Sequence, residues 1–251
     1  MIDLTRVQSE LENHRIYWHP TIGSTMTEAS RLASEGCVSG TVVGADEQTA
    51  GQGRYGRSWH SEPGSGLYVS IVLRNSFPPG TLQLVTLALG LATTDAILKA
   101  TDVACDLRWP NDVLLQSKKC AGILTQLEGT AIIAGIGINV NHGAFPDELS
   151  EIATSLRIAS GREHSRERLL VELVTSVTSY CSLFENEGPT PILDMFSRAS
   201  SFVDGRRVYV DQGDALLQGT TGGLNDSGFL LLRGDDGKQN VIIAGGVRAC
   251  S

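Results

Sequence analysis

The sequence is short of the features that mark secreted, disulfide-stabilised and membrane-spanning proteins. Its five cysteines are an odd number with no Cys-x-x-Cys pair, so neither a disulfide framework nor a zinc knuckle is expected. The first residues contain no basic segment followed by an apolar stretch, as a secretory signal would. Gln83 and Thr86 interrupt the longest apolar run, which therefore falls short of a membrane span. We expect a cytoplasmic protein without a membrane partner.

Positive charge is also scarce. The 20 lysines and arginines are outnumbered by 28 aspartates and glutamates, which gives a net charge of -8 at pH 7. Because a broad nucleic-acid interface needs clustered positive charge, no nucleic-acid partner is expected. The five histidines show no His-Glu-x-x-His or comparable metal-ligand spacing. Glycine, in contrast, is abundant: the 28 glycines exceed the usual share of about 7% and indicate tight turns or close approaches of the backbone.

The apolar pattern of residues 1–200 predicts an α+β fold. A central helix is expected from 81 to 99 and an amphipathic one from 166 to 185, followed by a short helix that ends near 200. The segment from Thr25 to Glu28 indicates a capping box that begins a further helix, which Gly36 ends. The segment before residue 20 has room for one helix. Strands are expected at 41–45, 67–73, 113–116, 122–127 and 132–140.

After residue 202, short expected strands alternate with turns rich in glycine and aspartate. These strands are expected at 208–210, 215–218, 229–232 and 241–244. About fifty residues of this pattern predict a small β-barrel. The chain is therefore expected to form two domains, a larger one over residues 1–201 and a β-barrel over residues 202–251.

The segment Gly51–Gly56 matches the dinucleotide-binding pattern Gly-x-Gly-x-x-Gly, but its context does not fit. No helix is expected to begin at Gly56, so there is no helix N-terminus to receive a pyrophosphate. No Gly-x-x-x-x-Gly-Lys-Ser/Thr loop occurs either. The pattern favours a flap between two strands, whose backbone N–H groups and arginines, Arg54 and Arg57, face an anionic ligand. The alternative is a solvated basic turn in a hairpin.

A second group of polar residues begins at Arg108–Asp112. Pro110 fixes a turn there, and Asn111 and Asp112 then stand at the start of a strand. Asp112 is a candidate Mg²⁺ ligand, and Lys119 is placed to neutralise charge on a phosphate. The alternative is a hairpin with a solvated pair of lysines. The strand Gly135–Asn139 ends in an amide, which is a candidate ligand contact or simply the end of a buried strand.

Together these segments resemble the biotin protein ligases over nearly the whole chain. The resemblance implies a mixed-sheet catalytic domain related to class II aminoacyl-tRNA synthetases, followed by an SH3-like barrel. It implies a biotin–[acetyl-CoA-carboxylase] ligase that uses ATP, biotin and Mg²⁺ and acts as a monomer or homodimer. The segments that carry the resemblance are Ser24-Thr25, Gln48, residues 50–59, Arg108–Asp112, residues 119–124 and Gly135–Asn139.

The resemblance also implies roles for individual residues. The implied biotin site consists of Ser24, Thr25, Gln48, Gly51, Gln52, Gly53, Arg54, Lys119 and Gly122. The implied ATP and adenylate site consists of Arg54, Arg57, Trp59, Asn111, Lys119 and Asn139. The implied catalytic residues are Lys119, Arg54, Arg57 and Asp112, the last also as the Mg²⁺ ligand.

The implied reaction has two steps. Biotin and ATP form biotinyl-5′-AMP, and the biotinyl group then passes to a lysine of a biotin carboxyl carrier protein. Two alternatives remain open, a related ligase for lipoate or octanoate and a non-catalytic biotin sensor. The lipoate and octanoate enzymes typically carry a histidine near a run of glycines, where this chain has residues 51–59.

Three features set this chain apart from the usual pattern of the family. Gln52 stands where the flap usually has an arginine, and Arg108 stands where the second motif usually has a lysine. About two dozen residues precede Ser24, too few for the helix-turn-helix domain of the family's regulatory branch. We therefore expect a ligase without repressor function.

Overall fold

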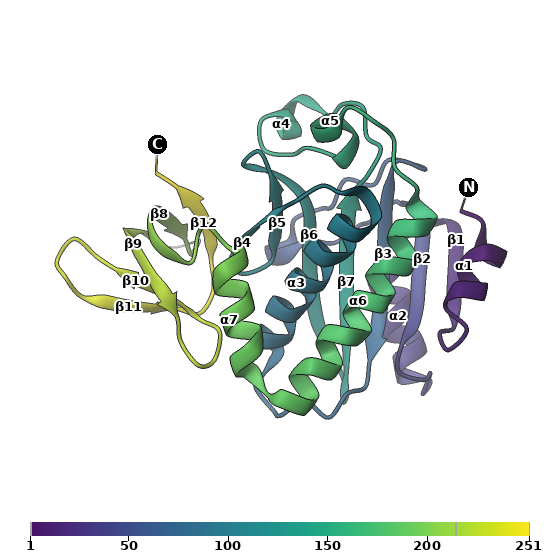
Figure 1. The fold of residues 1–251 in the computed structure, drawn as a ribbon, viewed down its shortest axis with the longest axis horizontal. Helices are drawn as coiled ribbons and strands as arrows, with labels where there is room; N and C mark the ends of the chain where they lie inside the picture. The colour runs from purple at the N-terminus through teal and green to yellow at the C-terminus, as the bar shows by residue number, and fades with distance from the viewer. Residues whose placement is uncertain (1, 214, 251) are drawn as a thin grey trace.

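The structure, a computed structural model that describes residues 2–213 and 215–250, contains two β-sheets (Figure 1). The larger sheet has seven strands in the order β1-β2-β3-β7-β6-β5-β4. Strands β1 and β2 run parallel, and the other neighbours pair antiparallel. The α+β class expected from the sequence is confirmed. The strands are β1 (Ile16–Ile22), β2 (Thr41–Gln48), β3 (Gly66–Leu73), β4 (Asp106–Arg108), β5 (Asp112–Leu115), β6 (Lys118–Glu128) and β7 (Ala131–Asn139).

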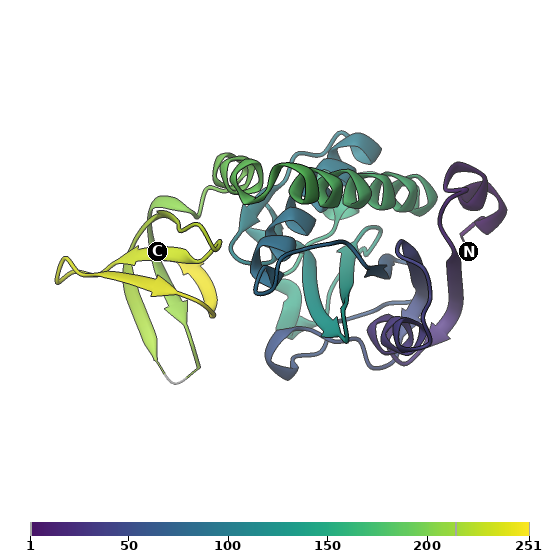
Figure 2. The same ribbon diagram turned by 90° about the horizontal axis from the view of Figure 1, so that it is seen from below.

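Helices cover both faces of this sheet. Figure 2 shows α6 and α7 on one side of it and α2 on the other. Helix α3 packs against α6 and against β6, while α2 packs against β2, β3 and β7. The larger core therefore lies under α3 and α6, and a smaller one lies under α2. The helices are α1 (Leu4–Glu10), α2 (Thr25–Ser34), α3 (Leu82–Thr101), α4 (Asp147–Ser150), α5 (Leu156–Ser160), α6 (Arg166–Glu187) and α7 (Pro189–Ala199).

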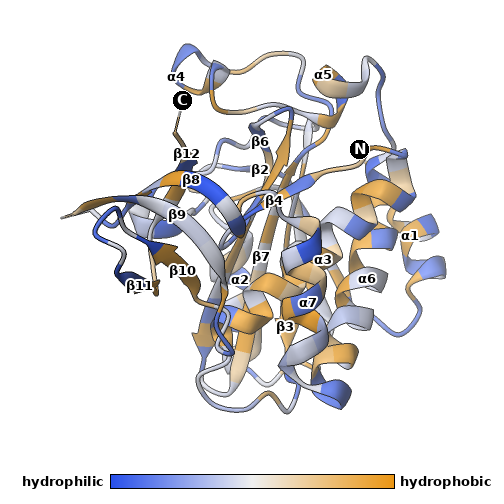
Figure 3. Cartoon of the chain, turned by 60° about the vertical axis from the view of Figure 1, so that its left-hand side comes forward, coloured by the Kyte–Doolittle hydropathy of each residue, from blue (hydrophilic) through white to orange (hydrophobic). Residues whose placement is uncertain are grey.

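Helix α3 is the central helix expected from the sequence. By length and composition it is apolar enough to cross a membrane, although the sequence suggested that no run was long enough. However, 72% of its most apolar 18-residue window is buried within the protein, as in the core helix of a soluble protein. In Figure 3, orange marks the hydrophobic residues of α3 and of the strands behind it. This helix therefore fills the core beneath the sheet.

The smaller sheet lies beside β4 and α7 (Figure 1). Its order is β11-β10-β9-β8-β12 and all its neighbours pair antiparallel. The buried indole of Trp109 donates a hydrogen bond to the carbonyl oxygen of Gly228 at 2.9 Å, which joins the second motif to this sheet. Its strands are β8 (Asp204–Asp211), β9 (Leu216–Leu224), β10 (Leu230–Arg233), β11 (Gln239–Ile242) and β12 (Gly246–Ala249).

Some expectations were wrong or incomplete. The capping box is absent from the described residues, since the N-cap of α2 is Ser24 and not Thr25. Thr25 instead directs its N–H and its hydroxyl to Oε1 of Gln48, at 2.8 and 3.0 Å. Strand β1 escaped prediction because Pro20 interrupts it and its burial pattern does not alternate. The short elements β4, β12, α4 and α5 were also missed.

Candidate active site

Glycines, which have no side chain, leave room for an inner cavity on the face of the large sheet that α2 covers. Ala131 and Ile133 of β7 pack against α2, so Gly135 and Gly137 point to the same side because side chains alternate along a strand. With Gly122 of the neighbouring β6, these glycines form the floor of the cavity. Its other lining residues are Thr25, Met26, Gln48, Gln52, Gly53, Arg54, Trp59, Val69, Asn111, Lys119, Ile123, Leu124 and Ile136.

Two large side chains occupy most of the inner cavity. A side chain at Gly137 would place its Cβ 2.5 Å from Cε2 of Trp59, and one at Gly122 would place its Cβ 2.8 Å from Cε of Lys119. The Lys119 ammonium lies 5.3 Å from the centre of the Trp59 ring, within cation–π range. Only about 50 Å³ of free space remains, so a ligand larger than a few waters has to displace these side chains.

The glycine-rich segment forms the flap expected from the sequence. Gln52 and Ser58 make an antiparallel bridge, and the N–H of Trp59 donates to the carbonyl oxygen of Gly51 at 2.9 Å. At the tip, a single 3₁₀ turn spans Arg54–Gly56. Among the described residues this turn leads directly to β3 and to no α-helix, in agreement with the rejection of a dinucleotide fold. The hydrogen bonds across the flap thus come from the backbone on either side of Gln52, whose own side chain is exposed.

Arg54 connects the flap to the segment Arg108–Asp112. Its Nη1 donates to Oδ1 of Asn111 at 3.0 Å, and Nδ2 of Asn111 donates to the carbonyl oxygen of Ile123 at 2.8 Å. The Arg54 guanidinium also lies 4.8 Å from the ring centre of its exposed neighbour Tyr55. Two segments that are 57 residues apart therefore meet at the mouth of the inner cavity.

The charged centre of the site is a carboxylate between two cations. Oδ1 of Asp112 lies 2.5 Å from Nζ of Lys119, and Oδ2 lies 2.6 Å from Nη2 of Arg108. Burial would raise the pKa of the Asp112 carboxyl, but the charges and hydrogen bonds of Lys119 and Arg108 outweigh it and hold the pKa below its usual value. Asp112 is therefore ionised and holds the Lys119 ammonium at the end of the cavity. Arg108 keeps the positive charge that a lysine would supply here.

Polar atoms at the far end of the inner cavity form a short chain. The hydroxyl of Ser70 donates to Oγ1 of Thr25 at 2.9 Å, and Thr25 bonds Gln48, whose Nε2 donates to Ser61 at 3.3 Å. Within residues 2–213 and 215–250, the buried Ser24 Oγ and Trp59 Nε1 have no hydrogen-bond partner. Buried polar atoms are seldom left unpaired, so atoms of this kind indicate groups that a ligand would satisfy.

A larger outer groove of about 430 Å³ adjoins the inner cavity. It lies between the large sheet and the small sheet, which contributes Arg206 and Arg248. Its volume falls in the range of small-molecule sites. The two spaces share Gly53, Arg54, Trp59, Asn111 and Lys119.

The structure gathers most of the expected site residues around these two spaces. The inner cavity is lined by Thr25, Gln48, Gln52, Gly53, Arg54, Trp59, Asn111, Lys119 and Gly122. The outer groove alone is lined by Arg57, Asp112 and Asn139, the last with its Nδ2 donating to the Thr154 carbonyl oxygen at 3.0 Å. In the described part of the chain Ser24 and Gly51 line neither space.

Sequence reasoning missed several residues that line the site. Gly135 and Gly137 belong to the expected strand Gly135–Asn139, and their alternation along it is the signal that would have marked the cavity floor. Arg206 and Arg248 had no such signal, because the approach of the small sheet to the groove is a tertiary contact.

Comparisons with known proteins agree with this geometry. The chain matches the Biotin/lipoate A/B protein ligase family over residues 18–142. It is 33% identical to the bifunctional ligase/repressor BirA of Bacillus subtilis, over 95% of this chain and 75% of that protein. It is 31% identical to the biotin–[acetyl-CoA-carboxylase] ligase of Mycobacterium tuberculosis, over 89% and 84%.

A solved structure extends the likeness to three dimensions. The biotin protein ligase of Aquifex aeolicus in complex with biotin and ATP has a TM-score of 0.83 and 29% identity, over 94% of this chain and 99% of that one. The sequence motifs, the fold and these relatives lead to one conclusion: the chain belongs to the biotin protein ligase family.

Proposed function

We propose that this chain is an ATP-dependent biotin–[acetyl-CoA-carboxylase] ligase. The observation that carries the proposal is the position of Lys119, whose side chain lines both the inner cavity and the outer groove. An acid bound in the cavity and a nucleotide bound in the groove would meet at this ammonium. The relatives support the choice of acid, since the Aquifex aeolicus structure holds biotin and ATP.

In the first step, a carboxylate oxygen of biotin attacks the α-phosphorus of ATP. An oxygen–phosphorus bond forms, the bond between the α-phosphorus and its bridging oxygen breaks, and pyrophosphate leaves. Lys119 would offset the negative charge that builds on the α-phosphate, and Arg54 would close over it from the flap. Such catalysis consists mainly of positioning and electrostatic stabilisation, for which Asp112 fixes the ammonium in advance.

In the second step, a lysine amine of a carboxyl carrier protein attacks the acyl carbon of biotinyl-5′-AMP. An amide forms, the amine loses a proton and AMP leaves. The intermediate has to be shielded from water between the steps. Gln48, Thr25 and the unpaired Nε1 of Trp59 are proposed to hold the biotin end, because they supply polar groups in the inner cavity, and the unpaired Ser24 precedes Thr25 directly in the chain.

Magnesium needs a separate assignment. The sequence pointed to Asp112 as its ligand, but each oxygen of that carboxylate already pairs with a cation. Asp112 therefore does not fit a magnesium site in this arrangement. Since Mg²⁺ commonly binds through substrate phosphates and waters, we propose that it enters with ATP.

The wider architecture is proposed as follows. The division into residues 1–201 and 202–251 is supported by the separate five-stranded sheet that begins with β8, which we take as the SH3-like barrel. The larger unit would be the relative of class II aminoacyl-tRNA synthetases.

The oligomeric state is proposed to be a monomer or a homodimer. Strand β1 is an edge strand of the large sheet and is a candidate for pairing with a second copy of the chain. The proposed location is the cytoplasm.

Labelling of a purified biotin carboxyl carrier domain tests the proposed function. With ATP and Mg²⁺, the protein should attach biotin to a single lysine of that domain and leave a lysine-to-arginine variant of the domain unlabelled. Lipoate and octanoate should not be attached. Attachment of lipoate or octanoate instead would move the chain to the sister activity, and tight biotin binding without transfer would favour the sensor.

A further inference from the structure

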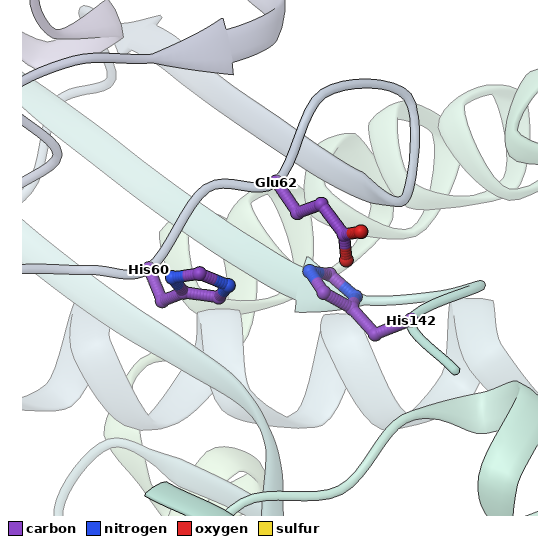
Figure 4. A group of neighbouring side chains, drawn as sticks. All are labelled: His60, Glu62 and His142. Carbon is purple, nitrogen blue, oxygen red and sulfur yellow. The ribbon is translucent and has the colours of Figure 1, made fainter. Parts of the chain in front are cut away.

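Two histidines and a glutamate converge at the edge of the outer groove, which His60 lines, and the proposed reaction gives none of the three a role (Figure 4). His60 and Glu62 lie in the segment between the flap and β3, and His142 follows β7. The antiparallel register of β3 and β7 pairs Gly66 with Asn139, so it brings together the chain before β3 and the chain after β7. One ligand atom from each of the three side chains lies within 4.8 Å of the others.

The hydrogen bonds around His142 determine which ring nitrogen is free. The hydroxyl of Tyr68 has one hydrogen, and it donates this to the carbonyl oxygen of Glu62 at 3.1 Å. The 3.2 Å contact between Tyr68 Oη and His142 Nε2 therefore requires Nε2–H to donate to the hydroxyl oxygen. The lone pair of the neutral ring is thus on Nδ1.

No hydrogen-bond donor among the described residues reaches the lone pair on Nδ1 of His142. His142 is fully buried, and its Nδ1 has no hydrogen-bond partner among the described residues. Phe145 stacks on the ring, with 5.0 Å between ring centres, and helps to fix its plane. Metal-ligating histidines typically have one ring nitrogen held by a hydrogen bond, which orients the other nitrogen toward the metal. In His142 the held nitrogen is Nε2 and the free one is Nδ1.

We propose that His60, Glu62 and His142 bind a divalent transition-metal ion of the zinc type. Two imidazoles and a carboxylate are ligands for Zn²⁺ and its neighbours, whereas Mg²⁺ and Ca²⁺ prefer an all-oxygen shell. Bonds of about 2.0–2.2 Å to one ion require the ligand atoms to close up from the present separation. Glu62 is exposed and free to make this movement. Three protein ligands leave a fourth position for water.

The ion would act on the flap from the edge of the outer groove. His60 follows Trp59 directly, and the Trp59 indole lies over Gly122 and Gly137 in the inner cavity. An ion that joins His60 and Glu62 to His142 would tie the end of the flap to the end of β7. Because the ion binds the folded chain, the melting temperature would also rise as the concentration of the ion increases.

Titration of the full, metal-free protein with Co²⁺ and Zn²⁺ tests this proposal without any activity assay. The variants are His60→Asn and Glu62→Gln, which leave the buried His142 in place. The matched control is His14→Asn, because His14 lies outside the cluster and its Nδ1 bonds the Gly40 carbonyl oxygen at 2.9 Å. The readouts are the Co²⁺ absorption spectrum, the binding stoichiometry and the Zn²⁺-induced shift in melting temperature.

The wild type and the His14 variant should bind one ion with nitrogen and oxygen ligands and melt at a higher temperature in Zn²⁺. The His60 and Glu62 variants should fold normally and lose affinity at least about tenfold. The proposal is overturned if the wild type binds no ion, if both cluster variants bind as tightly as the wild type, or if a thiolate charge-transfer band places the ion on a cysteine.

Discussion

Replacing Lys119 with alanine should lower the rate of biotin-dependent ATP–pyrophosphate exchange by about a hundredfold or more. The ammonium lies where the inner cavity meets the outer groove, and Asp112 holds it there before any substrate binds. A charge fixed in advance stabilises the transition state without reorganisation, so its loss acts on the chemical step. Single-turnover formation of the adenylate, followed with labelled ATP, measures this step directly.

Lys118→Ala is the matched control for this substitution. Lys118 is the preceding residue, its Nζ donates to the Ser150 carbonyl oxygen at 2.8 Å, and it lines neither space in the described part of the chain. This variant should keep a rate close to that of the wild type. Near-normal adenylate formation by the folded Lys119→Ala protein would show that the ammonium does not act on the phosphate.

Replacing Asp112 with asparagine should lower the free energy of unfolding by about 2–3 kcal/mol at pH 7. The substitution leaves Arg108 and Lys119 without their shared carboxylate in a largely buried setting, where the Asp112 side chain is 18% exposed. This residual exposure places the expected loss somewhat below the ~3–5 kcal/mol found when a fully buried pair is broken. Urea unfolding of the two proteins measures the difference.

The same comparison has a definite pH dependence. The folded-state pKa of Asp112 is lowered, so the carboxylate stabilises the fold fully above its unfolded pKa of about 3.9 and loses this effect as the pH falls through the folded pKa. The gap between wild type and Asp112→Asn should therefore be constant near neutrality and shrink in acid.

Asp235→Asn is the matched control, because Asp235 makes a bidentate ion pair with Arg207, at 2.6 and 2.7 Å, on the exposed surface. It should unfold at nearly the same urea concentration as the wild type. An Asp112 variant as stable as this control would mean that the buried pair does not hold the site together.

The closeness of Asp112 and Lys119 in the candidate site could be predicted from the sequence, because these residues are close together along the chain. Asp112 and Lys119 lie on adjacent antiparallel strands joined by a short turn, so local spacing was enough to bring the carboxylate and the ammonium together. The flap was predictable for the same reason, since Gly51 and Trp59 pair within one loop. Gly137 of β7 and Gly122 of β6 then leave room for Trp59 to pack on the sheet.

Features that depend on distant pairing were not predictable in this way. His60 and His142 are 82 residues apart and meet only through the register of β3 and β7, which no local pattern encodes. The capping box failed because a tertiary partner, Gln48, competes for the N–H and hydroxyl of Thr25. Arg206 and Arg248 reach the groove through the packing of the small sheet against the larger unit, to which the hydrogen bond from Trp109 to Gly228 contributes.

ATP–pyrophosphate exchange, measured with Mg²⁺ and with biotin, lipoate, octanoate or no acid, tests the central proposal most directly. Exchange should occur with biotin and be at background level with the other two acids and without acid. It should also be lost in Lys119→Ala and kept in Lys118→Ala. Exchange that requires lipoate or octanoate, or no exchange with any acid from folded protein, would contradict the proposal that this site activates biotin.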